Sequence, residues 1–145
     1  MVRIAYELPD VLTEPSEPNI TALLDPENLK GKHLATPNTP LPSSGPKAEY
    51  EEHSIAYQKK RAAMRAENVP EAEMNALFQT NQDIVEAMFE ESGQNGIVGA
   101  FEGGGYMAEG IYRSQQNCIM FTRTADFCAV CSEAIEKVND EYTLH

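Results

Sequence analysis

Apolar residues recur at helical spacing in two stretches, one in the middle of the chain and one at its end. The middle stretch follows Pro70, and its stripe consists of Met74, Leu77, Phe78, Ile84, Val85, Met88 and Phe89. Side chains three and four positions apart share one face of a helix, so the stripe predicts an amphipathic helix that ends near Gly93. We expect this face to be core, and a partner-binding groove is the alternative.

The last stretch begins around Asp126, and Asp126 or Thr124 would cap it. Its one-sided stripe consists of Phe127, Cys131, Ala134, Ile135, Val138 and Tyr142. The spacing predicts a final helix. Because these two stripes are the main apolar surface of the chain, we expect the final helix to pack against the helix of residues 74–89.

A thinner stripe precedes both, between Lys47 and Asn68. Its members are Tyr50, Ile55 or Ser54, Tyr57, Arg61 and Met64. Few apolar side chains share this face, so the pattern predicts a largely solvated helix. Pro70 suits the first turn of the helix that follows, and the two helices would form a helical hairpin.

Proline and glycine divide the chain into three segments. Eight of the nine prolines precede residue 47, and seven of the nine glycines lie in residues 93–110. Proline interrupts helices and glycine permits turns. We therefore expect an extended proline-rich lead over residues 1–46, a helical hairpin over 47–93, and a glycine-rich turn region with the last helix over 94–145. The predicted fold class is mainly α with few short strands (α+β), in one domain.

Short runs in the outer segments fit this scheme. Residues 96–101 form a short buried run, and residues 19–24 would form one helical turn or a brief strand. Three adjacent glycines at 103–105 permit positive φ angles or close backbone approach. A phosphate-binding loop is disfavoured, because the chain has neither the Lys-Ser/Thr pair of a P-loop nor the GxGxxG spacing.

The charge of the chain excludes some partners. Its 145 residues include 11 basic and 23 acidic side chains, for a net charge of −12. Nucleic-acid binding requires a basic face, and the acidity also disfavours anionic membrane surfaces. No apolar run approaches the roughly 18 residues of a membrane span, and the first twenty residues lack a signal-peptide pattern. We expect neither nucleic acid nor a membrane span.

Three cysteines offer candidate chemistry. Cys128 and Cys131 have the spacing of a redox or zinc-knuckle pair, and Cys118 lies ten residues upstream of Cys128. A closed zinc site needs a fourth ligand, and none of the histidines stands at a knuckle-like distance; they are His33, His53 and His145. A thioredoxin-type motif would need a preceding βαβ pattern. A disulfide between Cys118 and one of the pair is preferred, and three small buried side chains are the alternative.

Several motifs together carry a family resemblance. They are Glu102-Gly-Gly-Gly-Tyr106, Gly110-Ile-Tyr-Arg113, Cys118-Ile-Met120, Phe127-Cys-Ala-Val-Cys131 and, nearer the start, Glu17-Pro-Asn-Ile-Thr21. The combination resembles the C-terminal end of the bacterial IgA-protease family of zinc metallopeptidases. The similarity covers most of the chain, and the helical hairpin is its least diagnostic part.

The resemblance implies the lower, C-terminal subdomain of a metzincin-like zinc peptidase. In such enzymes an HExxH helix supplies two zinc ligands and a general base, and a methionine-bearing turn lies under the metal. The resemblance assigns that turn to Met120. It also makes Tyr106 and Tyr112 candidate transition-state donors and Arg113 a candidate substrate-binding residue.

The resemblance further implies a secreted or cell-surface protein, in which Cys118 would pair with Cys128 or Cys131. The sequence departs from the family in one respect, since no HExxH occurs in its 145 residues. We therefore expect zinc in the complete enzyme and none in this chain alone. The partners would be an HExxH-bearing half and a protein or peptide substrate. The chain would be an inactive C-terminal fragment of that peptidase, and a non-enzymatic binding or structural module is the alternative.

Overall fold

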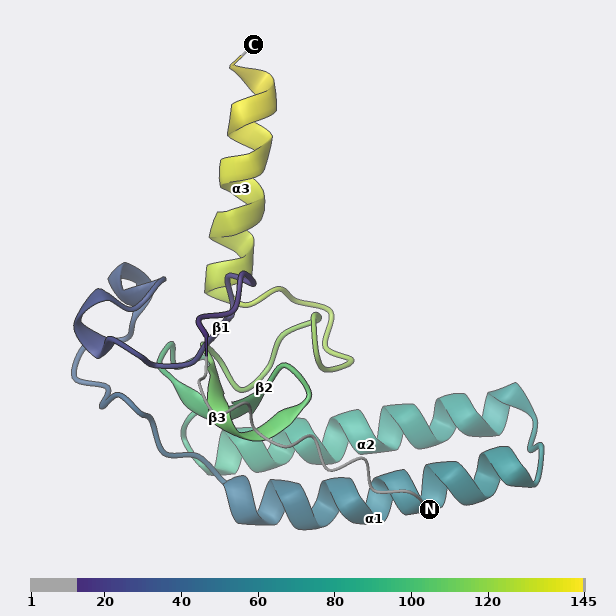
Figure 1. The fold of residues 1–145 in the computed structure, drawn as a ribbon. Helices are drawn as coiled ribbons and strands as arrows, with labels where there is room; N and C mark the ends of the chain where they lie inside the picture. Colours follow the sequence, from purple (N-terminus) through teal and green to yellow (C-terminus); the bar gives the residue numbers. More distant parts are fainter. Residues whose placement is uncertain (1–12, 145) are drawn as a thin grey trace. The chain divides into compact units, whose positions relative to one another are not determined.

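The computed structural model describes residues 13–144 and contains three α-helices, three short strands and two single-turn 3-10 helices (Figure 1). The helices are α1 (Lys47–Ala66), α2 (Glu71–Glu91) and α3 (Ala129–Thr143), the strands are β1 (Ile20–Thr21), β2 (Phe101–Gly104) and β3 (Met107–Arg113), and the 3-10 turns are η1 (Pro26–Asn28) and η2 (Lys32–Leu34). This content confirms a mainly α fold with few short strands.

The chain forms two compact units that do not follow the sequence segments. Among the described residues, the first unit contains the sheet and α3, and it draws on residues 13–44, 97–115 and 128–144. The second contains α1, α2 and the later segment 116–127. The first twelve residues of the expected proline-rich lead lie outside the part of the chain that the structure describes.

The second unit is built on the predicted helical hairpin, in which α1 and α2 run side by side (Figure 1). Four apolar residues of α2 are buried at helical spacing, namely Met74, Phe78, Val85 and Phe89. Two details differ from the predicted stripe, since Gln82 is buried among them and Ile84 is 43% exposed. None of the twenty residues of α1, all of them described, is buried. The expectation of a largely solvated first helix is therefore confirmed.

The first unit holds an antiparallel sheet in the order β1-β3-β2. A two-residue loop joins β2 to β3, and both of its residues, Gly105 and Tyr106, have positive φ angles of 54° and 66°. That combination is typical of a type I′ turn, whose twist matches that of the strands. Gly103, with φ of 105°, lies at a register shift in the same hairpin. The three glycines thus serve a tight hairpin.

A proline-rich segment before α1 pairs with the buried run that leads into β2. Thr36 donates its backbone N–H to the Val98 carbonyl at 2.9 Å, and Val98 donates its own N–H to Thr36 Oγ1 at 3.0 Å. In the same way, Ser43 donates its backbone N–H to the Ala100 carbonyl at 2.7 Å, and Ala100 donates its N–H to Ser43 Oγ at 3.0 Å. The lead, as far as it is described, therefore packs on its own chain.

The last helix departs from expectation at its start. Neither Thr124 nor Asp126 caps α3, which begins at Ala129 with Cys128 as the N-cap residue. The Ala129 N–H donates instead to Gln115 Oε1 at 2.6 Å. A side chain from an earlier loop thus satisfies one of the N–H groups that every helix start leaves open.

The apolar stripe of α3 is buried only in its first turn. Val130 and Cys131 are buried, whereas Ile135, Val138 and Tyr142 are 41%, 52% and 80% exposed. Most of the apolar stripe of this helix is therefore exposed beyond its first turn. Packing of α3 against α2 would join the two units and stays a prediction. Within residues 13–144, no helix combines the length and apolarity that crossing a bilayer requires.

Replacing Gly99 with alanine should destabilise the first unit. A Cβ at this position would overlap Ser43 Oγ and lie 3.0 Å from Thr39 Cγ2. Overpacking of this kind costs about 1–3 kcal/mol of unfolding free energy, which urea unfolding followed by circular dichroism would measure.

Ser43→Ala provides the control, because it removes the oxygen that the new Cβ would overlap. Gly99→Ala should cost less in that background than in the native chain, as expected for two residues in contact. If Gly99→Ala lowers the unfolding free energy equally in both backgrounds, contact with the Ser43 hydroxyl is not the reason that alanine is unfavourable at position 99.

Candidate functional site

The residues suggested by the family resemblance lie on three structural features. Tyr106 stands at the tip of the β2–β3 hairpin with its side chain fully exposed. Tyr112 and Arg113 are half-buried neighbours on the central strand, β3. Successive residues of a strand point to opposite faces, so Tyr112 and Arg113 project from different sides of the sheet.

Met120 lies in a hydrogen-bonded turn within segment 116–127 of the second unit. The Cys118 carbonyl accepts the N–H groups of Phe121 and Thr122 at 3.0 and 2.9 Å, and the Ile119 N–H donates to the Asp126 carbonyl at 2.8 Å. These bonds close the segment on itself. The side chain of Met120 is 63% exposed at the turn.

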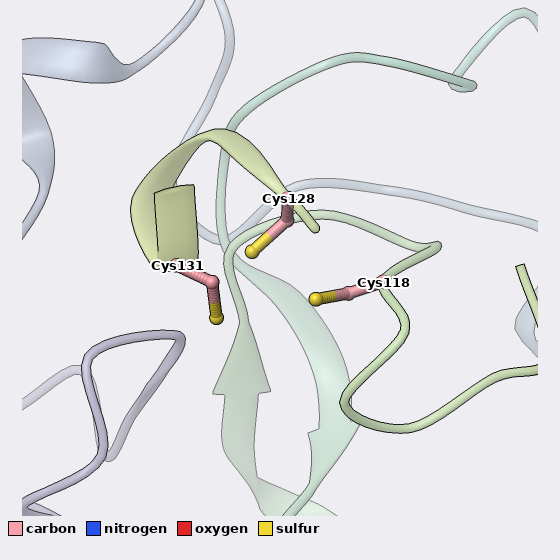
Figure 2. Close-up of side chains that lie close together, drawn as sticks. All are labelled: Cys118, Cys128 and Cys131. Atoms are coloured by element: carbon pink, nitrogen blue, oxygen red, sulfur yellow. The ribbon is translucent and has the colours of Figure 1, made fainter. Parts of the chain in front are cut away.

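The three cysteine side chains are all buried. Figure 2 shows that Cys128 and Cys131 come from the start of α3, whereas Cys118 comes from the segment that follows β3. Within the first unit, Ser114 Oγ lies 3.6 Å from Cys128 Sγ. The predicted disulfide between Cys118 and one of the pair would join the two units, and it stays a prediction.

The catalytic zinc ion of a metallopeptidase such as thermolysin is held by histidine and carboxylate ligands, and the described residues do not provide such a set. In residues 13–144, no three histidine or carboxylate side chains gather within reach of one metal ion. His33 Nε2 lies 2.6 Å from Glu133 Oε2, and His53 Nε2 lies 2.8 Å from Asn81 Oδ1. His145 lies outside the described residues. These residues therefore do not fit a catalytic zinc site.

Glu133 of α3 is a carboxylate that contacts a histidine, His33. A hydrogen bond from Lys137 and then one from His33 hold the pKa of this carboxyl below its usual value. The ionised form of Glu133 is thereby favoured. Glu133 and Lys137 form an ion pair along α3, to which His33 of η2 is hydrogen-bonded, and ion pairs near the surface contribute little to stability.

The second unit contains a cavity of about 270 Å³ between its two helices and segment 116–127. The helix residues that line it recur three and four positions apart, so each helix presents one continuous face. On α1 this face includes Tyr50, Ser54, Tyr57 and Arg61, and on α2 it includes Phe78, Asn81, Gln82 and Val85. Segment 116–127 closes the cavity with Phe121, Thr122 and Arg123.

The charged side chains that line this cavity are both positive. They are Arg61 and Arg123, and no aspartate or glutamate lines the cavity. The guanidinium carbon of Arg123 lies 3.7 Å from the centroid of the Phe78 ring, and that of Arg61 lies 5.9 Å from the same centroid. Cations favour the face of an aromatic ring, so Phe78 helps to hold both arginines at the cavity.

Gln82 fixes the third wall of the cavity. Its Oε1 accepts the backbone N–H of Arg123 at 2.9 Å, and its Nε2 donates to Glu86 Oε1 at 2.7 Å. The residue is buried, and buried amides of this kind are stable when both ends have partners. Segment 116–127 is thereby attached to α2.

The sequence predicts the helix faces that line this cavity, but not the cavity itself. The stripe of Tyr50, Ser54, Tyr57 and Arg61 was predicted as one face of the first helix, and Ser54 rather than Ile55 belongs to it. The contribution of Arg123 was missed, because no local pattern brings it to Phe78 across 45 positions. The sequence feature that could have indicated this contribution is a basic residue, Arg123, two positions after the aromatic Phe121.

Comparison with known proteins identifies one family. A sequence model of IgA Peptidase M64 matches residues 2–139 of the chain. A search of curated proteins found no match to the chain.

Titration of thiols should find one reactive group in the unfolded, unreduced protein. A disulfide from Cys118 to Cys128 or Cys131 leaves one of the three cysteines as a thiol. Such a bond would close a loop of about ten residues and contribute about 2–3 kcal/mol in the loop-entropy model. Reduced protein is the control and should give three thiols; three thiols without reduction would contradict the disulfide.

Proposed function

The chain belongs to the IgA Peptidase M64 family, and on this premise we propose that it forms the C-terminal part of a zinc-dependent enzyme that hydrolyses peptide bonds in protein substrates. The observation that carries the proposal is the extent of the family match, which runs from residue 2 to residue 139. The zinc ligands would come from an HExxH-bearing segment outside these 145 residues. The enzyme would act at the cell surface or in the medium.

In this proposal, residues of β3 act on the peptide. Hydrolysis passes through a tetrahedral oxyanion, and a phenol O–H that donates to it stabilises the transition state more than the ground state. Tyr112 is the first candidate for this donor, because its ring is half-buried and lies on the central strand. Arg113 would bind a carbonyl or carboxylate of the substrate, and Tyr106 is the second candidate donor.

Met120 has a structural role in the proposal. The Cys118 carbonyl closes a turn around it by accepting two backbone N–H groups. A turn that is fixed by its own hydrogen bonds supports the assignment of Met120 to the methionine turn, which in such enzymes lies beneath the metal. The exposed side chain of Met120 is available to contact the part of the protein that carries the ligands.

A non-enzymatic binding module is the second candidate function. The observation that favours it is the cavity of the second unit, which has an ordered polar lining and shares no residue with the proposed peptidase site. The two functions differ in what they require. Hydrolysis requires the HExxH-bearing segment, whereas binding requires only this chain.

The purified chain should contain no stoichiometric zinc and should not cleave a protein substrate such as casein. The reason is the missing set of histidine and carboxylate ligands in residues 13–144. Elemental analysis and a cleavage assay measure the two outcomes. One zinc ion per chain that survives replacement of all three cysteines would contradict the prediction, whereas zinc that is lost with the cysteines would favour a zinc knuckle.

In the complete protein, Tyr112→Phe should lower kcat by about 10- to 1000-fold and change KM little. Loss of a donor that acts only in the transition state has this kinetic signature. Tyr106→Phe is the matched comparison, because its ring is fully exposed at the hairpin tip. If both variants keep the native kcat and only their unfolding free energies fall, the rings are structural and the assignment is wrong.

A further inference from the structure

We propose that the cavity of the second unit binds a ligand that carries a carboxylate group. The acidic side chain of a peptide and a small free dicarboxylate offer the same chemistry to this cavity. The inference goes beyond peptide hydrolysis, because the cavity contains none of the residues assigned to that reaction.

The first argument is the local reversal of charge. The chain as a whole carries 23 acidic side chains against 11 basic ones, yet two arginines and a histidine line the cavity and no acidic residue does. Within residues 13–144, neither Arg61 nor Arg123 forms an ion pair with a carboxylate. Glu86, which is near in sequence, is instead bonded to Gln82. A concentrated positive charge in a recess attracts anions from solution.

The second argument is an unsatisfied donor. The Nε atom of Arg61 is buried and has no hydrogen-bond partner in the described residues, and its Nη1 has one partner, Gln58 Oε1 at 3.3 Å. Buried donors nearly always have an acceptor, and the exceptions need an explanation. The guanidinium group of Arg61 is therefore short of acceptors, and a carboxylate in the cavity would offer two oxygens to its accessible N–H groups.

The third argument is that the arginines are held in place before any ligand arrives. Both guanidinium groups lie near the ring of Phe78. The backbone of Arg123 is bonded to the buried Gln82, so the start of this side chain is fixed as well. Groups that are already positioned lose less entropy when they bind.

The donors of the cavity favour a carboxylate over a phosphate. Protein phosphate sites commonly use backbone N–H groups at helix N-termini. The cavity-lining residues of α1 and α2 lie inside those helices, where the backbone N–H groups are used within the helix. The Arg123 N–H is used by Gln82. Only side-chain donors remain, and two of them are guanidinium groups.

The size of the cavity sets the size of the ligand. Its 270 Å³ is slightly below the range of about 300–1,000 Å³ for pockets that enclose drug-sized molecules. One acidic side chain or one small dicarboxylate suits such a volume. Tyr57 and Val85 in the wall would contact the apolar stem of either ligand.

Titration of the 145-residue chain, followed by NMR of its backbone amides, tests the proposal. The probes are acetyl-Ala-Glu-Ala-amide, its glutamine counterpart, glutarate and inorganic phosphate. The glutamate peptide or glutarate should bind at least about 10-fold more tightly than the glutamine peptide, because charge-assisted hydrogen bonds are the stronger ones. The resonances of His53 and Asn81 should shift, and whichever carboxylate binds more tightly identifies the source of the ligand. Equal affinity for the glutamate and glutamine peptides, or tighter binding of phosphate, would overturn the proposal.

Variants on α1 and in segment 116–127 locate the binding. Arg61→Gln and Arg123→Gln should each weaken binding of the better carboxylate by about 10- to 100-fold. Arg65→Gln is the matched control, because Arg65 lies on the same helix, is exposed and does not line the cavity; it should change the affinity less than 2-fold. Arg61→Lys keeps the charge without the fork and should retain part of the affinity even if Arg61→Gln fails to fold. Native affinity in both Arg61→Lys and Arg123→Gln would overturn the proposal.

Discussion

The buried side chain of Gln82 connects segment 116–127 to the helical hairpin of the second unit. One end of its amide accepts the Arg123 N–H, and the other end donates to Glu86. If one partner were removed, the buried amide would be left with an unsatisfied group at a cost of about 1–3 kcal/mol. The position of Arg123 at Phe78, the third wall of the cavity and the place of the Met120 turn on the hairpin all depend on this attachment.

In the first unit, two hydroxyl side chains help to pair a proline-rich segment with the buried run that leads into β2. A segment that contains Pro37, Pro40 and Pro42 has few N–H groups to offer a neighbouring chain. Thr36 and Ser43, at its two ends, each contribute a backbone N–H as a donor and a side-chain oxygen as an acceptor. The buried run before β2 is thereby paired without a regular strand, which satisfies the requirement that buried backbone groups have partners.

Periodicity in the sequence was sufficient to predict the helices, because the apolar spacing of α2 and α3 is a local property. The glycines at 103–105 likewise indicated positive φ angles, which the hairpin uses. Local patterns did not predict the cap of α3, because its acceptor comes from Gln115, 14 positions away. The burial of Gln82 was also missed, since its partner Arg123 is 41 positions away. From the sequence alone, an amide side chain such as Gln82 is expected at the surface, because the sequence does not show which group it binds. The roles proposed for Tyr112, Arg113 and Met120 came from family resemblance and not from the physics of the chain.

The division of the chain between two units has a consequence for its synthesis. The polypeptide passes from one unit to the other after residues 44, 96, 115 and 127. The α1–α2 hairpin consists of consecutive residues that precede the β2–β3 hairpin, so it can form early, from local contacts alone. The sheet joins β1 to a strand more than 80 positions later, and its assembly has to wait until the ribosome has released β3. During translation from the N-terminus, the residues of β1 therefore remain without their strand partner while the helical hairpin is already able to fold.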